Sequence, residues 1–255
     1  MELRNIGPAY MSGRIADIAV DQNNPSTWYT AVGSGGVWKT TNAGTTWTPI
    51  FDDQPVYSIG DVTIAPSNSN IIWVGTGENN GGRHISFGDG VYKSLDGGQT
   101  WKNMGLNKSE HVSDIIIHPK NPDVVWVSAQ GPLWSGGGER GLYKTTDGGE
   151  TWKQVLKPAD EWTGVTSLLI DPRNPDKLYA ATWARQRLIG AYVGTNEGAG
   201  IHTSSDGGET WTELKTGLPQ GNMGKIGMAI SPMNPDVIYA TIETDNRGGG
   251  FYRSA

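Results

Sequence analysis

Cysteine is absent from the 255-residue chain. Its absence excludes disulfide bonds, thiolate metal sites and cysteine nucleophiles, and it leaves the cellular compartment open. Long hydrophobic runs are absent too, since no segment approaches the roughly 18 apolar residues that a membrane span needs. The first thirty residues carry no apolar signal-peptide core. We therefore expect no membrane insertion.

Basic clusters are also lacking. The formal net charge is -6 at pH 7, and the sequence contains no Lys/Arg-rich run. Both features argue against binding to nucleic acid or to anionic membrane surfaces. The four histidines have no metal-ligand spacing, and neither a nucleophile elbow nor a phosphate loop is present. We expect no metal and no cofactor.

Glycine (37 residues) and tryptophan (11 residues) are abundant. Four of the tryptophans and seven of the glycines fall in one eight-residue motif, Ser/Thr-x-Asp/Asn-x-Gly-x-Thr-Trp, which occurs at residues 40–47, 94–101, 145–152 and 204–211. The closing tryptophans are 54, 51 and 59 residues apart. A period near fifty in a chain of short β-like runs is typical of a protein built from copies of one small sheet.

Each repeat contains the same succession of predicted strands. In the first, an apolar run (residues 15–20) is followed by a Pro/Asn turn, a second run (28–32), a short loop, a third run (36–40), the motif and a fourth strand. Proline and asparagine end strand pairing at the turn. Five such units predict an all-β fold, namely a β-propeller of four-stranded blades in which five blades are represented. We expect residues 1–255 to form one domain.

The two ends of the chain leave the closure of the ring open. The fifth unit stops where its motif would begin, so it lacks a fourth strand, whereas residues 3–7 resemble the fourth-strand segment at residues 101–105. The N-terminal strand would then complete the last blade and close a five-bladed ring. Alternatively, and favoured by the abrupt end, the chain is the N-terminal portion of a longer protein with further blades or a second propeller beyond Ala255. An incomplete ring would also expose an edge for self-assembly.

The repeated motif itself is expected to be structural. Its Asp or Asn accepts hydrogen bonds from backbone N–H groups of its own turn, its glycine adopts a positive φ, and its tryptophan packs between neighbouring sheets. One carboxylate per motif is too few for a calcium site. The structural residues are Asn42, Trp47, Asp96, Trp101, Asp147, Trp152, Asp206 and Trp211.

These motifs resemble Asp-boxes, also called BNR repeats, which occur in sialidases, xyloglucanases and the luminal domain of sortilin. The whole unit, with a turn such as Asp-Pro-x-Asn-Pro-Asp before the second strand, is similar to bacterial BNR-repeat proteins described as sortilin-like or glycosyl-hydrolase-like. The resemblance implies a propeller with boxes at its periphery, away from the ligand face, and an extracellular or periplasmic location. The box itself does not imply one activity, because it serves unrelated functions.

Functional residue types gather in the loops between the second and third strands and in the loops between blades. These loops vary in length and sequence, whereas the Pro/Asn turns are uniform, so the loop side is the expected binding face. Aromatic rings beside arginine suit a glycan or polypeptide ligand. Each charge taken singly is better explained as a solvated loop residue, whereas the face as a whole favours binding. The candidate ligand-binding residues are Tyr10, Arg14, Tyr57, Arg83, His84, His111, Trp134, Arg140, Trp162, Arg185, Arg187 and Tyr192.

A non-catalytic binding module is the leading functional prediction, and a glycoside hydrolase is the alternative. Hydrolysis needs two carboxylates flanking the scissile bond, for which Asp52, Asp53 and Glu78 are weak candidates. The resemblance to xyloglucanases implies an acid just before the Gly-Gly of the first blade, and Gly33 and Ser34 stand there instead. A third possibility is an assembly scaffold or filament subunit.

Three further carboxylates recur at one position of the first strand in successive units: Asp17, Asp61 and Asp114. If these strands line a central channel, the side chains either converge, raising one another's pKa or holding a cation, or bond the backbone of the neighbouring blade. The second role is the favoured one. Ser167 and Met228 are expected to break the series in the last two units.

Overall fold

A computed structural model describes residues 13–254. The described residues form strands, turns and loops, and none of them belongs to a helix that is long and apolar enough to cross a membrane. The strands group into five main sheets and one small hairpin. Their bounds are β1 (Ile15–Val20), β2 (Trp28–Val32), β3 (Gly36–Thr40), β4 (Thr48–Pro49), β5 (Ile59–Ala65), β6 (Asn68–Thr76), β7 (Val91–Ser94), β8 (Lys102–Asn103), β9 (Val112–Ile117), β10 (Val125–Ala129), β11 (Gly141–Thr145), β12 (Lys153–Leu156), β13 (Thr163–Asp171), β14 (Asn174–Ala184), β15 (Gln186–Arg187), β16 (Tyr192–Val193), β17 (Gly200–Ser204), β18 (Thr212–Leu214), β19 (Met223–Ile230), β20 (Ile238–Thr244) and β21 (Gly250–Arg253).

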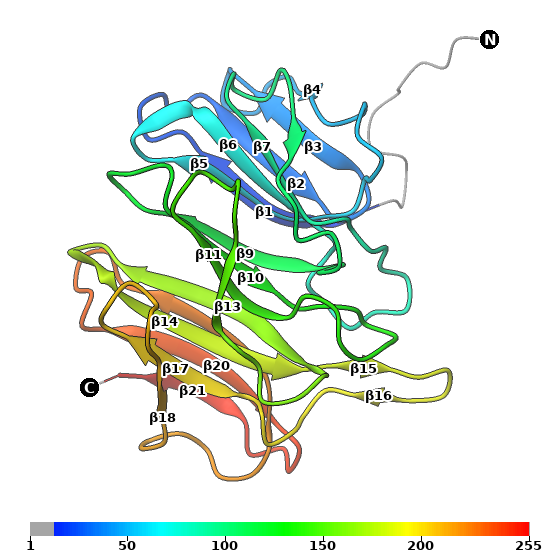
Figure 1. The fold of residues 1–255 in the computed structure, drawn as a ribbon, viewed down its shortest axis with the longest axis vertical. Helices are drawn as coiled ribbons and strands as arrows, with labels where there is room; N and C mark the ends of the chain where they lie inside the picture. The colour runs from blue at the N-terminus through cyan, green and yellow to red at the C-terminus, as the bar shows by residue number, and fades with distance from the viewer. Residues whose placement is uncertain (1–12, 255) are drawn as a thin grey trace.

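The predicted propeller of four-stranded Asp-box blades is confirmed. Strands follow chain order within each sheet, as β1-β2-β3-β4 in the first, and neighbours are antiparallel. The first strands of the sheets, β1, β5, β9, β13 and β19, contact one another in succession along the inner side. The fifth sheet has three strands among the described residues, β19-β20-β21. The one element not expected is the β15–β16 hairpin, which extends from the β14–β17 loop (Figure 1).

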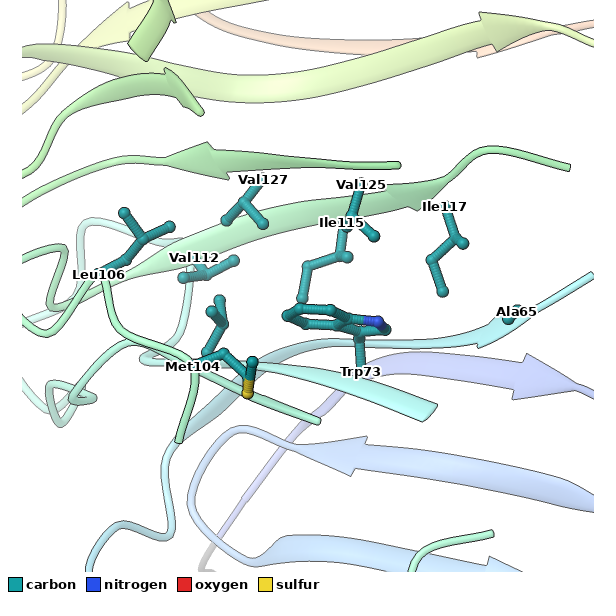
Figure 2. Packing of buried hydrophobic residues seen from close by; sticks show 10 residues of the cluster. Ala65, Trp73, Met104, Leu106, Val112, Ile115, Ile117, Val125 and Val127 are labelled. Atoms are coloured by element: carbon teal, nitrogen blue, oxygen red, sulfur yellow. The ribbon is translucent and has the colours of Figure 1, made fainter. Parts of the chain in front are cut away.

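Separate hydrophobic cores lie between successive sheets. The core between the second and third sheets is drawn in Figure 2, where Trp73 from β6 faces Ile115 from β9 and Val127 from β10. Trp73 is fully buried, and its ring meets the edge of Trp152 at a centroid distance of 5.9 Å. Because each blade buries one face against the next, the sheets stabilise one another as neighbours in a repeat array.

The five sheets form an arc in which the first and last lie at opposite ends of the long axis (Figure 1). The open end at the first sheet exposes apolar side chains that the repeat buries elsewhere. Ile15 and Ile18 are 58% and 51% exposed, whereas the equivalent Ile59 and Val62 of β5 are 0% and 1% exposed. Residues 13–254 therefore do not close a five-bladed ring by themselves, and the predicted closing strand at residues 3–7 lies outside the described residues.

The Asp-box predictions on turn geometry are confirmed. In the second box, Asp96 Oδ1 accepts the N–H of Thr100 at 2.9 Å, and Asp96 Oδ2 accepts its hydroxyl at 2.6 Å. The Ser94 hydroxyl accepts the N–H of Gly98 at 2.8 Å, and Gly98 has a φ of +90°. Equivalent bonds to the box Asp or Asn occur in the other three copies, at Asn42, Asp147 and Asp206.

The box tryptophans pack as predicted where a preceding blade is present. Trp101 donates to the Ile50 carbonyl at 2.7 Å, and Trp152 donates to the Met104 carbonyl at 2.7 Å, each on the preceding sheet. Trp47 belongs to the first described sheet and is 38% exposed. The second and third boxes therefore bind the preceding blade through their tryptophans, whereas the tryptophan of the first box is exposed at the open end.

Asp17, Asp61 and Asp114, on the first strands of the first three sheets, bond the backbone of the neighbouring blade, which is the role favoured from the sequence. Each accepts a backbone N–H from the first strand of the next sheet: Asp17 Oδ2 from Val62 (3.4 Å), Asp61 Oδ2 from Ile115 (3.1 Å) and Asp114 Oδ2 from Leu168 (2.9 Å). Burial, and then the charges of Asp17 and Asp114, raise the pKa of Asp61 well above its usual value. Burial raises the pKa of Asp114 to about 7.

The last member of this series differs from the sequence prediction by one residue. Gly227, and not Met228, pairs with Thr241 in the fifth sheet as Asp17 pairs with Ala31 in the first. Lys225 stands where the other inner strands have Ile or Val, so an alignment that begins at the first aliphatic residue, Ile226, is late by one position.

Candidate functional site

One loop crosses the binding face predicted from the sequence. Residues 78–84, which we call the strap, belong to the β6–β7 loop of the second sheet and reach the fourth and fifth sheets. Three successive strap carbonyls each accept a hydrogen bond from a cationic side chain of those sheets. The pairs are Lys225 Nζ to Asn79 O (2.8 Å), Arg185 Nη1 to Asn80 O, and Arg187 Nε to Gly81 O (3.0 Å).

The strap and the β15–β16 hairpin hold each other reciprocally. Arg187 of the hairpin binds Gly81 of the strap, while Arg83 of the strap donates to the carbonyl of Ile189 at 3.0 Å. The Arg187 guanidinium also lies 4.5 Å from the centroid of the Tyr192 ring, a cation–π contact. A Cβ at Gly81 would lie 2.5 Å from the Tyr192 ring, so only glycine permits this approach. Two loops from different blades thus form one surface.

Arg140, predicted to bind ligand, instead organises the β10–β11 loop from inside. It is 3% exposed, and its guanidinium donates only to backbone carbonyls. The acceptors are Gln130, Pro132, Ser135, Gly137 and Trp162. Burial lowers the pKa of Arg140 to about 10. We assign it a positioning role, because its donors are engaged beneath the surface.

Arg185 is likewise a positioning residue. It is fully buried and donates to Asn80 and Gly131 carbonyls, and its Nε has no hydrogen-bond partner among the described residues. Burial lowers the pKa of Arg185 to about 9. His111 is 2% exposed, and burial, followed by the charge of Arg185, lowers its pKa well below the usual value. Both residues lie under the strap, where a ligand on the surface does not reach them.

Arg14 and Glu78 form a bidentate ion pair between the first and second sheets. The Glu78 carboxylate lies against the backbone of Gly33, where an added Cβ would lie 2.8 Å from its Cδ. Glu78 therefore occupies the space that a side chain at position 33 would fill. It is 6% exposed, and the other two carboxylate candidates, Asp52 and Asp53, lie exposed in the β4–β5 loop. Burial, and then the charge of Asp53, raise the pKa of Asp52.

Exposed aromatic rings border this surface. Trp134 is 50% exposed and Tyr57 is 58% exposed. Trp134 follows Leu133, whose carbonyl accepts the N–H of Arg187 at 2.9 Å, so the tryptophan lies beside the hairpin. Tyr57 is within hydrogen-bonding distance of the Ser86 hydroxyl, next to the strap. His84 is exposed as predicted, Trp162 is half-buried, and Tyr10 lies outside the described residues.

Sequence reasoning missed Lys225, whose side chain reaches the strap. The equivalent positions of the other blades are Ile15, Ile59, Val112 and Val165, so a lysine here breaks an aliphatic repeat. That break was the available signal. Burial, and then the charge of Arg185, lower the pKa of Lys225. Gln130, also missed, is fully buried, and its Oε1 has no partner among the described residues.

No group of three or more metal-ligating side chains occurs in the described part of the chain. The arrangement instead offers aromatic faces, guanidinium groups and amides, held by loop-to-loop hydrogen bonds. Aromatic rings can stack on the apolar faces of ligands, and charged donors can fix the orientation of polar ligands.

Comparison with known proteins agrees with the repeat architecture. Residues 89–223 match the family model Sortilin-Vps10, described as sortilin, neurotensin receptor 3. The chain belongs to the Sortilin-Vps10 family. This confirms the resemblance to sortilin-like Asp-box propellers.

Relatives with curated names are xyloglucanases. A xyloglucanase of Paenibacillus sp. is 24% identical over 186 residues, covering 72% of this chain and 17% of the relative. A xyloglucanase of Hypocrea jecorina is 30% identical over 172 residues, covering 61% of this chain and 18% of the relative. The chain spans less than a third of the length of the curated relatives it matches.

Solved structures share the fold. An ancestral GH74 enzyme superposes with a TM-score of 0.71 at 23% identity, covering 98% of this chain and 30% of that one. The GH74 xyloglucanase of Xanthomonas campestris gives a TM-score of 0.69 at 15% identity, over 94% and 36% of the two chains. YCF48 of Cyanidioschyzon merolae gives 0.56 at 17% identity, over 97% and 74%.

Proposed function

We propose that the loop face of this chain binds a glycan. The observation that carries the proposal is the continuous surface made by the strap, the β15–β16 hairpin and the β10–β11 loop, with Trp134 and Tyr57 exposed at its border. Its loops are held by hydrogen bonds between blades, so little order must be gained on binding. Sugar rings present apolar faces to aromatic side chains and hydroxyl groups to charged donors. The naming of curated relatives as xyloglucanases supports a glycan over a polypeptide.

Calorimetric titration with a panel of plant and microbial oligosaccharides, xyloglucan oligosaccharides included, tests this proposal. Trp134→Ala and Tyr57→Ala are each expected to weaken binding about tenfold, because an aromatic contact contributes about 1.5 kcal/mol beyond simple burial. Phe251→Ala is the matched control, since Phe251 is 69% exposed on β21, away from these loops. Equal affinity in all three variants, or no binding by the wild type, rejects the assignment.

Glycoside hydrolysis is the second candidate. It is favoured by the position of Glu78, whose carboxylate lies between Arg14 and Gly33 at the edge of the loop face, and by the hydrolase names of the relatives. Asp52 or Asp53 would supply the second carboxylate. Reducing-sugar release from the same panel should then be lost in Glu78→Gln and in one of Asp52→Asn or Asp53→Asn. The absence of turnover by the wild type on every polysaccharide rejects it.

Assembly through the open end remains a separate candidate. The exposed Ile15 and Ile18 of β1 form a face of the kind that is buried between blades elsewhere. Light scattering over a concentration series tests it, and a monodisperse monomer at every concentration rejects it. An extracellular or periplasmic location belongs to the glycan proposal, since polysaccharides of this kind lie outside the cytoplasm, and fractionation of the producing cells would test it.

A further inference from the structure

The loop face of this chain, whose formal net charge is -6, carries cationic side chains that are bound by backbone carbonyls. Five cationic side chains from four blades meet around the strap and the β10–β11 loop: Arg83, Arg140, Arg185, Arg187 and Lys225. Each of them donates to backbone carbonyls. Within residues 13–254, none of the five forms an ion pair with a carboxylate.

This mode of binding orients the charges without neutralising them. A carbonyl dipole satisfies an N–H donor but carries no net charge, so the field of each guanidinium or ammonium persists at the surface. Arg185 and Arg140 are buried, where the field is screened less than in water. Nearby carboxylates offset part of the charge of the cations that lie under the surface. Asp160, Glu110 and Glu161 act on Arg140, Glu110 acts on Arg185, and Asp114, Glu78 and Glu243 act on Lys225. Arg83 is exposed and Arg187 is half-buried, and neither forms an ion pair within the described residues.

Two of the five have side chains that a ligand can reach. Arg83 is exposed, and only its Nη2 has a hydrogen-bond acceptor, the Ile189 carbonyl, among the described residues. Arg187 is half-buried, bonded through Nε and Nη2 to Gly81 and stacked on Tyr192. Their reciprocal bonds fix both guanidiniums at the same contact between strap and hairpin. A fixed guanidinium receives a carboxylate with two parallel hydrogen bonds.

We propose that the glycan recognised by this face is acidic, a uronate-containing oligosaccharide whose carboxylate is bound by Arg83 and Arg187. The inference rests on the proposed glycan binding and names its ligand class. Trp134 provides the apolar platform beside Arg187, so one sugar ring would stack while its carboxylate, or that of a neighbouring ring, meets the guanidinium groups. Arg140, Arg185 and Lys225 act as positioning residues that hold the loops.

The test compares an oligogalacturonate with a neutral xyloglucan oligosaccharide of equal length by calorimetry, at about 20 mM and about 500 mM NaCl. The acidic oligomer is expected to bind at least about tenfold more tightly at low salt, and to lose that advantage at high salt, because exposed charges are then screened. Arg83→Gln and Arg187→Gln should each weaken its binding about tenfold, the effect of losing one charge-assisted contact. Lys102→Gln removes one charge from an exposed outer strand and should leave binding unchanged.

The outcomes separate the inference from the function on which it rests. Tighter or equal binding of the neutral oligosaccharide, without salt dependence, overturns the acidic ligand and retains glycan binding. Binding of neither oligosaccharide overturns both. Tighter binding of an oligo-aspartate peptide than of the oligogalacturonate assigns the charge to a polypeptide partner and also overturns the inference. If Arg187→Gln does not fold, the affinity of Arg83→Gln, which changes an exposed residue, and the salt dependence of wild-type binding still test whether the ligand is acidic.

Discussion

Replacing Asp114 by asparagine removes a titrating group from the inner contact between the third and fourth sheets. The carboxylate accepts the Leu168 N–H at 2.9 Å, and burial raises its pKa to about 7 from a usual value of 3.8. The charge of Asp17 raises this pKa further, while that of Lys225 lowers it. An amide oxygen accepts the same hydrogen bond but stays neutral at every pH.

The sign of the effect follows from the direction of the pKa shift. Because the folded protein binds this proton more tightly than the unfolded chain, the stabilisation is fully present below pH 3.8 and is lost as the pH rises through about 7. Between pH 5 and pH 8 the loss amounts to about 3 kcal/mol, at about 1.4 kcal/mol for each pH unit below the folded pKa. Asp114→Asn should therefore gain stability relative to the wild type over this interval.

Urea denaturation at pH 5, 6, 7 and 8 measures the difference. From pH 5 to pH 8, the stability of Asp114→Asn relative to the wild type should increase by about 3 kcal/mol. Ser167→Ala is the matched control, because Ser167 is the equivalent position on the next inner strand and carries no titratable group. A constant difference between Asp114→Asn and the wild type across the series refutes the reasoning.

Three other substitutions test the box, the core and the loop support. Asp147→Asn should lower stability at pH 7 and less so towards pH 3, because bonds from Thr151 hold the pKa of Asp147 well below its usual value; a pH-independent loss in denaturation curves contradicts this. Trp73→Ala, at a fully buried position, should cost about 3–5 kcal/mol by thermal or urea unfolding, and a loss near zero contradicts the packing. Arg140→Met should speed amide hydrogen exchange across residues 130–139, and unchanged protection there would show that the carbonyl bonds do not order the loop.

Much of the fold was predictable because its determinants are local. The box bonds join residues four apart, as between Asp96 and Thr100, so the sequence motif contains its own structure. Strand alternation and the Pro/Asn turns set the boundaries of the blades. The role of Asp61 was also foreseen, since a residue repeated at one position of each inner strand has the same neighbour in each blade.

For the candidate site, the sequence predicted which face of the sheets carries it, but not which side chains are exposed on that face. The variable loops predicted one side of the sheets as the binding face, but the burial of each loop side chain depends on contacts across blades. Arg140 and Arg185 were grouped with exposed residues because residue type alone does not reveal burial. Lys225 was missed because its acceptor, Asn79, lies 146 residues away in the chain.

The sequence by itself therefore determined the blades and their order, through interactions that span a few residues and repeat, and it predicted the loop side as the binding face. The tertiary structure decided which side chains reach that side. It brought the strap onto the fourth and fifth sheets, paired Glu78 with Arg14 across 64 residues, and left Arg83 exposed and Arg187 half-buried between the strap and Tyr192. These contacts break the repeat, and their positions follow from the curvature of the whole arc, which no single unit specifies.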